Sequence, residues 1–268
     1  MNTLARPALT VPNGPDVMST ARLVRAYVTE AKYEMLRLLR TIAFAVPLIV
    51  LPLGIYLLFG VVFAREAVAK DPAIANLLFA GFAVFAAMGP AIFGVGIVLA
   101  IERDAGLLKL KRALPVPTGA YLLAKMATAL FFGVLVTSLM IIAGLLVGRL
   151  TLSVSQLAAM SAVLVIGTLP FAAIGLFIGA HVSGNVAPAV ANLIYLPMTW
   201  LSGIFFPLPP LLRKWAMIWP AFHLDQAVLA AGGLTQFRAI NPWTSVAMLA
   251  AFTAVFGGLA LRRLARKG

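Results

Sequence analysis

The stretch IERDAGLLKLKRALPVP, residues 101–117, lies between two long apolar runs and interrupts them with charge. Its acidic and basic residues are Glu102, Arg103, Asp104, Lys109, Lys111 and Arg112. Hydrocarbon does not accommodate such a cluster, so we expect the segment in water or at a membrane surface. Leu107, Leu108 and Leu110 are spaced as one face of a helix. The stretch therefore predicts a short amphipathic helix over residues 102–113 that offers a docking surface to a soluble partner.

The composition around this stretch indicates a membrane protein. The chain has 268 residues, of which 62% are hydrophobic and 11% charged, with a mean hydropathy of +1.03. Soluble domains carry about 25% charged residues, so a helical bundle in a lipid bilayer is predicted. The net charge of +13 does not indicate a nucleic-acid partner, because the basic residues lie between apolar spans. With no cysteine and two histidines, the chain is expected to bind no metal and no cofactor.

Six segments reach the length of about 20 mostly apolar residues that a spanning helix needs. They are residues 42–64, 75–101, 121–148, 157–180, 187–206 and 244–261. Prolines inside these segments are tolerated, because neighbouring helices can satisfy the backbone groups that a proline frees. The predicted fold is an all-α membrane protein, in which residues 41–268 form one six-helix transmembrane domain.

Lysine and arginine are divided unequally between the two sides that six spans create. One side holds the N-terminal segment, the loop between the second and third spans and the C-terminus. It carries 15 of these residues, Lys125 included, and the other side carries 6. Cytoplasmic loops are the ones enriched in Lys and Arg. Both termini and residues 101–117 are therefore predicted on the cytoplasmic side of the inner (cytoplasmic) cell membrane.

Residues 20–40 have the pattern of an amphipathic helix. Their apolar residues share one face, and five arginines and lysines occupy the other. We expect this helix to lie in the membrane interface, with its basic face toward lipid phosphates. The alternative is a helix packed on the surface of a partner protein. Residues 1–19 are polar and contain three prolines, which predicts a disordered leader and no signal peptide.

Residues 207–233 are apolar but interrupted by prolines. They predict two short helices, Pro210–Trp219 and Phe222–Ala231, that form a re-entrant hairpin at the extracytoplasmic edge. Lipid does not tolerate exposed irregular backbone at depth, so the hairpin must pack on the bundle. His223 and Asp225 have no nucleophile beside them, so we expect them to anchor the hairpin and predict no catalytic residue. Gly175 and Gly179, four residues apart, suggest a helix-packing face.

Two regions of the chain resemble type-2 ABC exporter permeases, the ABC-2 type. ERDAGLLKLKRALP, residues 102–115, is similar to the coupling segment of that family, with Leu107 where threonine is common. LSGIFFP, residues 201–207, followed by WPAFHLDQAVL, residues 219–229, is similar to the stretch around its fifth span and outer hairpin. Six spans and a basic N-terminal helix agree with this pattern, so the resemblance covers about residues 20–265.

The resemblance implies the membrane half of an ATP-driven exporter. Its substrate would be apolar or amphiphilic, such as a drug, a lipid or a glycan-lipid, and would leave the cytoplasm or the inner leaflet. The sequence has no GxxxxGK(S/T) phosphate loop, so ATP and magnesium are expected on a separate ABC ATPase subunit. Two permeases, expected as a homodimer, would work with two ATPases. The chain would then be a transport subunit and not an enzyme.

The coupling segment supplies the residues that the resemblance places against the ATPase. They are Glu102, Arg103, Asp104, Gly106, Leu107, Leu108, Leu110 and Arg112. Glu102 is the strongest candidate, because it ends a span and could pair with a basic residue of the ATPase or of the N-terminal helix. The alternative for Glu102 is a solvated side chain paired locally with Arg103 or Lys109.

A second group of residues is suited to an apolar substrate pathway, with generic packing or lipid contact as the alternative. It comprises Phe82, Phe85, Met88, Phe93, Met198, Phe205 and Phe206. A secondary transporter or channel that is not driven by ATP remains the rival function. It would need intramembrane charge or inverted repeats, and the sequence shows neither. A membrane enzyme would need clustered histidines or acids near one surface.

Overall fold

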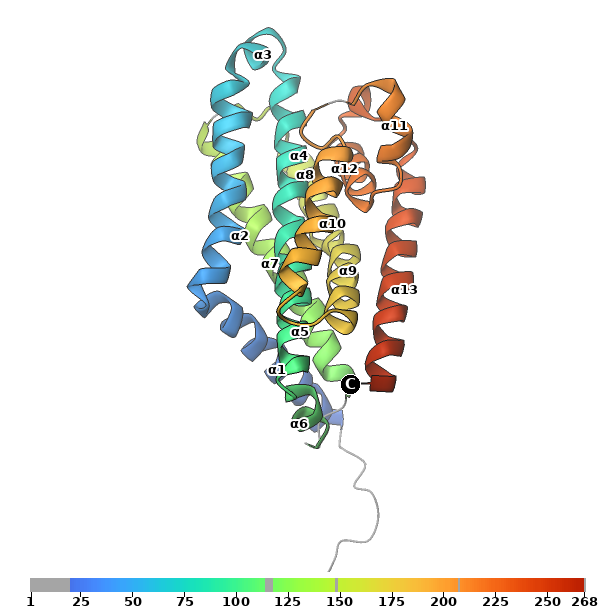
Figure 1. Ribbon diagram of the computed structural model, residues 1–268. Helices are drawn as coiled ribbons and strands as arrows, with labels where there is room; N and C mark the ends of the chain where they lie inside the picture. Colours follow the sequence, from blue (N-terminus) through green and yellow to red (C-terminus); the bar gives the residue numbers. More distant parts are fainter. Residues whose placement is uncertain (1–19, 114–117, 148, 207, 268) are drawn as a thin grey trace, which may run out of the picture.

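The computed structural model describes residues 20–113, 118–147, 149–206 and 208–267, with side chains described throughout these except at residues 43, 111–120, 210 and 267. The elements within these ranges are all helical (Figure 1). The predicted leader, residues 1–19, lies outside the described residues. Residues 20–40, for which a helix is predicted, form α1, Thr20–Arg40.

Among the described residues, five helical stretches are long and apolar enough to cross a membrane, and they coincide with five of the six predicted spans. They are Phe44–Phe63, Ala73–Asp104, Tyr121–Val147, Val154–His181 and Pro242–Arg266. The first stretch is α2 (Ile42–Ile55) with a π-helical continuation to Phe63, and the second is α4 (Ala73–Gly89) followed by α5 (Val95–Asp104). The third is α7 (Thr118–Val147), the fourth is α8 (Val154–Ile166) followed by α9 (Thr168–His181), and the fifth is α13 (Pro242–Lys267). A π-helical turn, Pro90–Gly94, joins α4 to α5, where a proline lacks the N–H that a regular turn would use.

The fifth predicted span, residues 187–206, is shorter than predicted. It is α10, Ala187–Leu201, of 15 residues, which corresponds to about 22 Å against the roughly 30 Å of a bilayer core. The helix ends because Gly203, with φ 73°, turns the backbone into the left-handed region. Residues 202–206 then form a bend that packs on α4.

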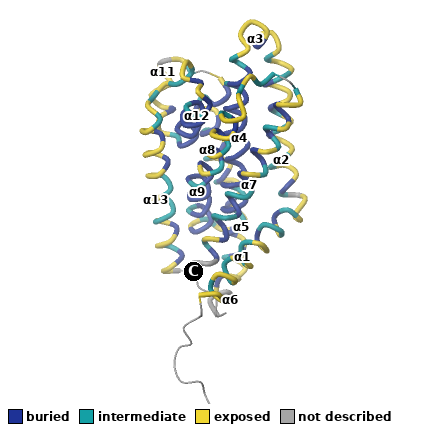
Figure 2. The backbone as a smooth tube through the Cα atoms, turned by 180° about the vertical axis from the view of Figure 1, so that it is seen from behind, coloured by how far each residue is buried: buried dark blue, intermediate teal, exposed yellow. Residues whose placement is uncertain are grey.

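Burial is greatest along the centre of the bundle. Figure 2 shows α4, α9 and the short helix α12 as mostly buried, whereas α13 is mostly exposed and α2 is mainly a mixture of exposed and intermediate residues. α9 lies between α5 and α13 and contacts both closely. In a membrane protein the exposed apolar faces of α2 and α13 are available to lipid or to another chain.

Three short helices gather at one end of the bundle, which we call the α3 end. They are α3 (Arg65–Lys70), α11 (Pro210–Ala216) and α12 (Pro220–Ala231) (Figure 1). Two short helices are present as predicted within residues 207–233, of which residue 207 lies outside the described part, but α11 ends at Ala216 and not at Trp219, and α12 begins at Pro220 and not at Phe222. Residues 220–229 are all buried, against α4, α8 and α13. His223 donates from Nε2 to the carbonyl oxygen of Met217 at 2.9 Å, as expected of an anchoring residue.

The opposite end, which we call the α6 end, holds α1, α6 (Leu107–Ala113) and the carboxyl end of α13 (Figure 1). The single helix predicted over residues 102–113 is wrong in its boundaries. Residues 102–104 continue α5, and a turn at Ala105 and Gly106 separates them from α6. Gly106 has φ 74°, the left-handed conformation that commonly ends a helix at a glycine.

Helices α5 and α9 approach each other through glycines. A Cβ placed on Gly96 would lie 2.7 Å from the carbonyl oxygen of Gly175, and one on Gly179 would lie 2.6 Å from the carbonyl oxygen of Gly96. The packing face predicted at Gly175 and Gly179 is therefore confirmed, with α5 as its partner. Backbones this close allow little relative movement of the two helices.

Replacing Gly96 with alanine should destabilise the protein by about 1–3 kcal/mol, because the added methyl group meets backbone that cannot move aside. Thermal unfolding of the purified protein in detergent measures this effect. Gly258→Ala in α13 is the matched control, since a Cβ there would meet nothing within 4 Å. Equal stability of the two variants would contradict the close packing of α5 on α9.

Candidate functional site

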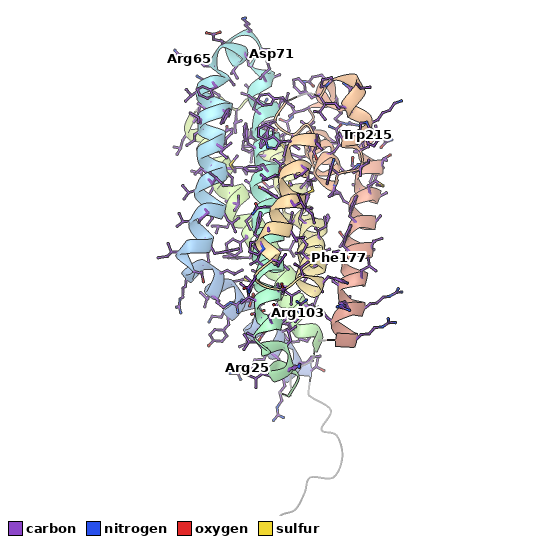
Figure 3. All side chains as sticks on the ribbon, in the orientation of Figure 1. Arg25, Arg65, Asp71, Arg103, Phe177 and Trp215 are labelled. Carbon is purple, nitrogen blue, oxygen red and sulfur yellow. The ribbon has the colours of Figure 1, made fainter. Side chains whose placement is uncertain are left out.

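Three consecutive charged residues end α5, and each has its own partners. Glu102 is buried, at 3% exposure, whereas Arg103 is half-buried and Asp104 is exposed. Figure 3 places Arg103, together with Arg25 of α1, at the α6 end of the bundle, opposite Arg65, Asp71 and Trp215. Within the charged stretch, Glu102 and Arg103 are therefore folded into the protein, whereas Asp104 and Lys109 are exposed.

Glu102 lies in a cluster of five side chains from three helices, which we call the Glu102 cluster. Its members are Glu34 and Arg37 of α1, Glu102 of α5, and Tyr121 and Lys125 of α7. Lys125 Nζ lies 2.9 Å from Glu102 Oε2 and also pairs with Glu34. Arg37 pairs with Glu102 through Nη1 and approaches Glu34 Oε1 at 3.5 Å through Nη2. The Tyr121 hydroxyl donates to Glu102.

The Glu102 cluster contains two acids and two bases, so its charges balance. Lys125 is 1% exposed and Glu34 is 5% exposed, and buried charges of this kind are tolerated only when they are paired and hydrogen-bonded. Burial disfavours a charged Arg37, but Glu34 and Glu102 outweigh that effect and raise the pKa of Arg37 above its ordinary value. The cluster therefore ties α1, α5 and α7 together just before α6 begins.

The geometry decides between the alternatives for Glu102. It pairs with the N-terminal helix, one of the two expected kinds of partner, and the alternative of a solvated Glu102 paired with Arg103 or Lys109 is wrong. Sequence reasoning missed Glu34, Tyr121 and Lys125. One signal was present, because Glu34 is an acid on the apolar face of α1, between Ala31 and Leu38.

The remaining coupling candidates divide into exposed and buried residues. On α6, Leu107 and Leu110 are 39% and 62% exposed, whereas Leu108 is buried toward the bundle. Arg103 and Asp104 contact the carboxyl end of α9 and the turn that follows it. The side chain of Arg112 lies outside the described residues. Among the described side chains of α6, residues 107–110, the outward ones are thus Leu107, Lys109 and Leu110, a mixture that suits contact with another protein.

An apolar cavity of about 530 Å³ lies between α2, α4, α5, α10 and the bend after α10. Its polar side chains are few: Asn192, Tyr195 and Thr199. The other lining residues are Phe44, Pro47, Leu48, Leu51, Pro52, Ile55, Phe59, Phe82, Phe85, Gly89, Phe93, Ile97, Leu196, Trp200, Phe205 and Phe206. Leu51, Trp200 and Phe206 are more than half exposed, so the cavity is open on their side. A site of this size and lining suits an apolar or amphiphilic molecule.

The predicted pathway residues divide around this cavity. Five of them line it, namely Phe82, Phe85, Phe93, Phe205 and Phe206. Met88 and Met198 are fully buried and are not among the lining residues in the described part of the chain. Aromatic contacts fix the wall: the rings of Phe82 and Phe205 are 4.9 Å apart, and those of Phe93 and Tyr195 are 5.1 Å apart. Tyr195 was missed by sequence reasoning.

Comparison with known proteins gives two matches. A model of the family described as ABC-2 type transporter matches residues 25–231. A protein of Bacillus subtilis (strain 168) described as "Putative transport permease YvfS" is 25% identical over 227 residues, which is 83% of this chain and 90% of that protein. The family match runs from α1 through α12, so it includes both the Glu102 cluster and the apolar cavity.

Proposed function

Because the chain belongs to the ABC-2 type transporter family and has membrane-spanning helices, we propose that this transport permease is the membrane subunit of an ATP-driven exporter. Its substrate is apolar or amphiphilic, such as a drug, a lipid or a glycan-lipid. ATP and magnesium are held by a separate ABC ATPase, since the sequence has no phosphate loop. The observation that carries the proposal is the Glu102 cluster, which ties α5, the helix directly before α6, to α1 and α7.

Transmission of force from the ATPase follows from this geometry. The exposed side of α6, with Leu107 and Leu110, docks on the ATPase. Movement of α6 displaces the end of α5, and the Glu102 cluster carries that displacement to α1 and α7. Buried ion pairs transmit such movement because separating them leaves unpaired charge in a dry environment. Glu102 acts in this scheme through Arg37 and Lys125, inside the permease.

The membrane arrangement is proposed on the same basis. α10 serves as the sixth membrane segment, and α11 with α12 forms the re-entrant hairpin. The α6 end lies on the cytoplasmic side of the inner membrane, because α1, α6 and the end of α13 carry most of the Lys and Arg residues. α1 lies at the membrane interface while it packs on α2 and α7. A second copy of the chain closes the open side of the cavity, so that substrate moves between two permeases.

Replacing Leu110 with aspartate should abolish stable association with the ATPase. Leu110 is the most exposed apolar residue of α6 among those described, and a charged side chain there would be buried unpaired at the contact. A loss of about 2 kcal/mol or more of binding free energy, typical of a residue central to an interface, is expected. Co-purification of the co-expressed ATPase with the tagged permease measures it.

Leu211→Asp is the matched control, since Leu211 is 81% exposed on α11 at the α3 end. This control variant should retain the ATPase. An ATPase that stays bound and active in the Leu110 variant would remove α6 as the docking element. Failure of every ABC ATPase to associate with the unaltered chain would overturn the proposed function itself.

A further inference from the structure

Arg103 and Asp104 follow Glu102 directly but contact a different part of the bundle. Arg103 donates from Nη1 to the carbonyl oxygen of Gly179 and from Nη2 to that of Val182, each at 2.9 Å. Asp104 Oδ2 accepts from the backbone N–H of Gly184 at 2.7 Å. A 2.9 Å ion pair between Arg103 Nη2 and Asp104 Oδ1 holds the two side chains together. We call this set of contacts the Arg103 clamp.

The Arg103 clamp satisfies backbone groups that a helix end leaves without partners. α9 ends at His181, so the carbonyl groups of its last turn have no partner within the helix. A guanidinium is well placed there, because it donates in a fixed fork and its positive charge complements the carboxyl end of a helix. The Gly184 N–H, in the turn after α9, is satisfied from the same side by Asp104. The first three residues of this turn, 182–184, are thus attached to α5 at Val182 and Gly184.

Close packing reinforces the attachment. Gly96 of α5 meets Gly175 and Gly179 of α9 at backbone contact, and a Cβ on Gly184 would lie 3.1 Å from the Cα of Ile101. The end of α5 therefore cannot move without carrying the turn at residues 182–186. α10 begins at Ala187, directly after that turn, and supplies Tyr195, Leu196 and Thr199 to the apolar cavity.

We propose that Arg103 and Asp104 are positioning residues that transmit movement of the coupling segment to α10 and so set the shape of the apolar cavity. This inference rests on the proposed function. The route is separate from the Glu102 cluster, which leads from the same segment to α1 and α7. Consecutive residues of α5 thus contact two parts of the bundle. Glu102 binds the N-terminal helix α1, and Arg103 and Asp104 bind the turn from which α10, a wall of the cavity, begins.

Distance measurement between spin labels tests the Arg103 clamp in the full chain without any partner. The chain has no cysteine, so labels can be placed on introduced cysteines alone. Ala105→Cys with Asn185→Cys reports on the clamp, and Ala105→Cys with Tyr33→Cys reports on the Glu102 cluster, all at exposed positions. In the otherwise unaltered protein, the distances between both pairs of labels should be narrowly distributed. The Arg103→Ala substitution should broaden the distances between labels at residues 105 and 185 and leave those between residues 105 and 33 narrow. Arg37→Ala should do the reverse.

Two variants of Asp104 separate the clamp from general damage to the fold. Asp104→Asn keeps an oxygen that accepts from Gly184 N–H and should keep the narrow 105–185 distribution, whereas Asp104→Ala should lose it. In the reconstituted complex, Arg103→Ala and Asp104→Ala should retain the bound ATPase but lose stimulation of ATP hydrolysis by an amphiphilic dye, and Asp104→Asn should retain both. A 105–185 distribution that is unchanged in Arg103→Ala overturns the clamp and leaves the proposed function intact, because that measurement involves no ATPase.

Discussion

Replacing Glu102 with alanine is expected to lower the free energy of unfolding by about 3–5 kcal/mol, the cost of breaking a buried ion pair by removing one partner. Among the described acids, Lys125, at 1% exposure, would keep Glu34, and the Tyr121 hydroxyl would lose its hydrogen bond to Glu102. Unfolding of the purified protein, followed by its helical signal during titration with denaturing detergent, measures the change. Glu66→Ala is the control, since Glu66 is an exposed acid on α3 and its removal should change stability little.

A double variant separates the charge balance of the Glu102 cluster from its contribution to packing. Glu102→Gln with Lys125→Met removes one acid and one base together and leaves Glu34 beside Arg37, 3.5 Å apart. We expect the double variant to be more stable than the sum of its two single variants predicts, because each single variant leaves an unbalanced buried charge and the double variant does not. Additive effects would contradict a coupled cluster. If the double variant folds well but its complex no longer links ATP hydrolysis to transport, the cluster has a role beyond stability.

The membrane fold could be predicted from the sequence because apolar length alone identifies most spanning helices. The same criterion was wrong for residues 187–206, where apolar residues continue past the point at which α10 ends. Gly203 at φ 73° stops the helix, although its position within an apolar run predicts that the span continues through it. Gly106 has the same effect in the coupling segment, so Glu102 belongs to a spanning helix and not to α6.

The candidate site was predicted in part, and the missing part depends on tertiary contacts. The charge of residues 102–104 is visible in the sequence, but their partners on other helices and turns are 19 to 80 residues away along the chain. Nothing local to Lys125 marks it as a partner of both Glu34 and Glu102. The apolar character of Phe85, Met88 and Phe93 predicts all three as pathway residues. Phe85 and Phe93 line the cavity, whereas Met88, which lies between them in the sequence, is fully buried. Which face of a buried helix meets a cavity depends on its neighbours.

Replacing Leu196 with tryptophan is expected to reduce transport by about tenfold or more, since losing about 1.4 kcal/mol of substrate binding already accounts for a factor of ten. Leu196 lines the cavity and is 50% exposed, so an indole ring can extend into the open space without displacing backbone. ATP-driven accumulation of an amphiphilic fluorescent dye in inside-out vesicles measures the effect. Leu193→Trp is the matched control, because Leu193 lies three residues earlier on α10, is 73% exposed and is not among the lining residues of the cavity in the described chain. Equal inhibition by both tryptophans would show that the surface of α10, and not the cavity, is what transport requires.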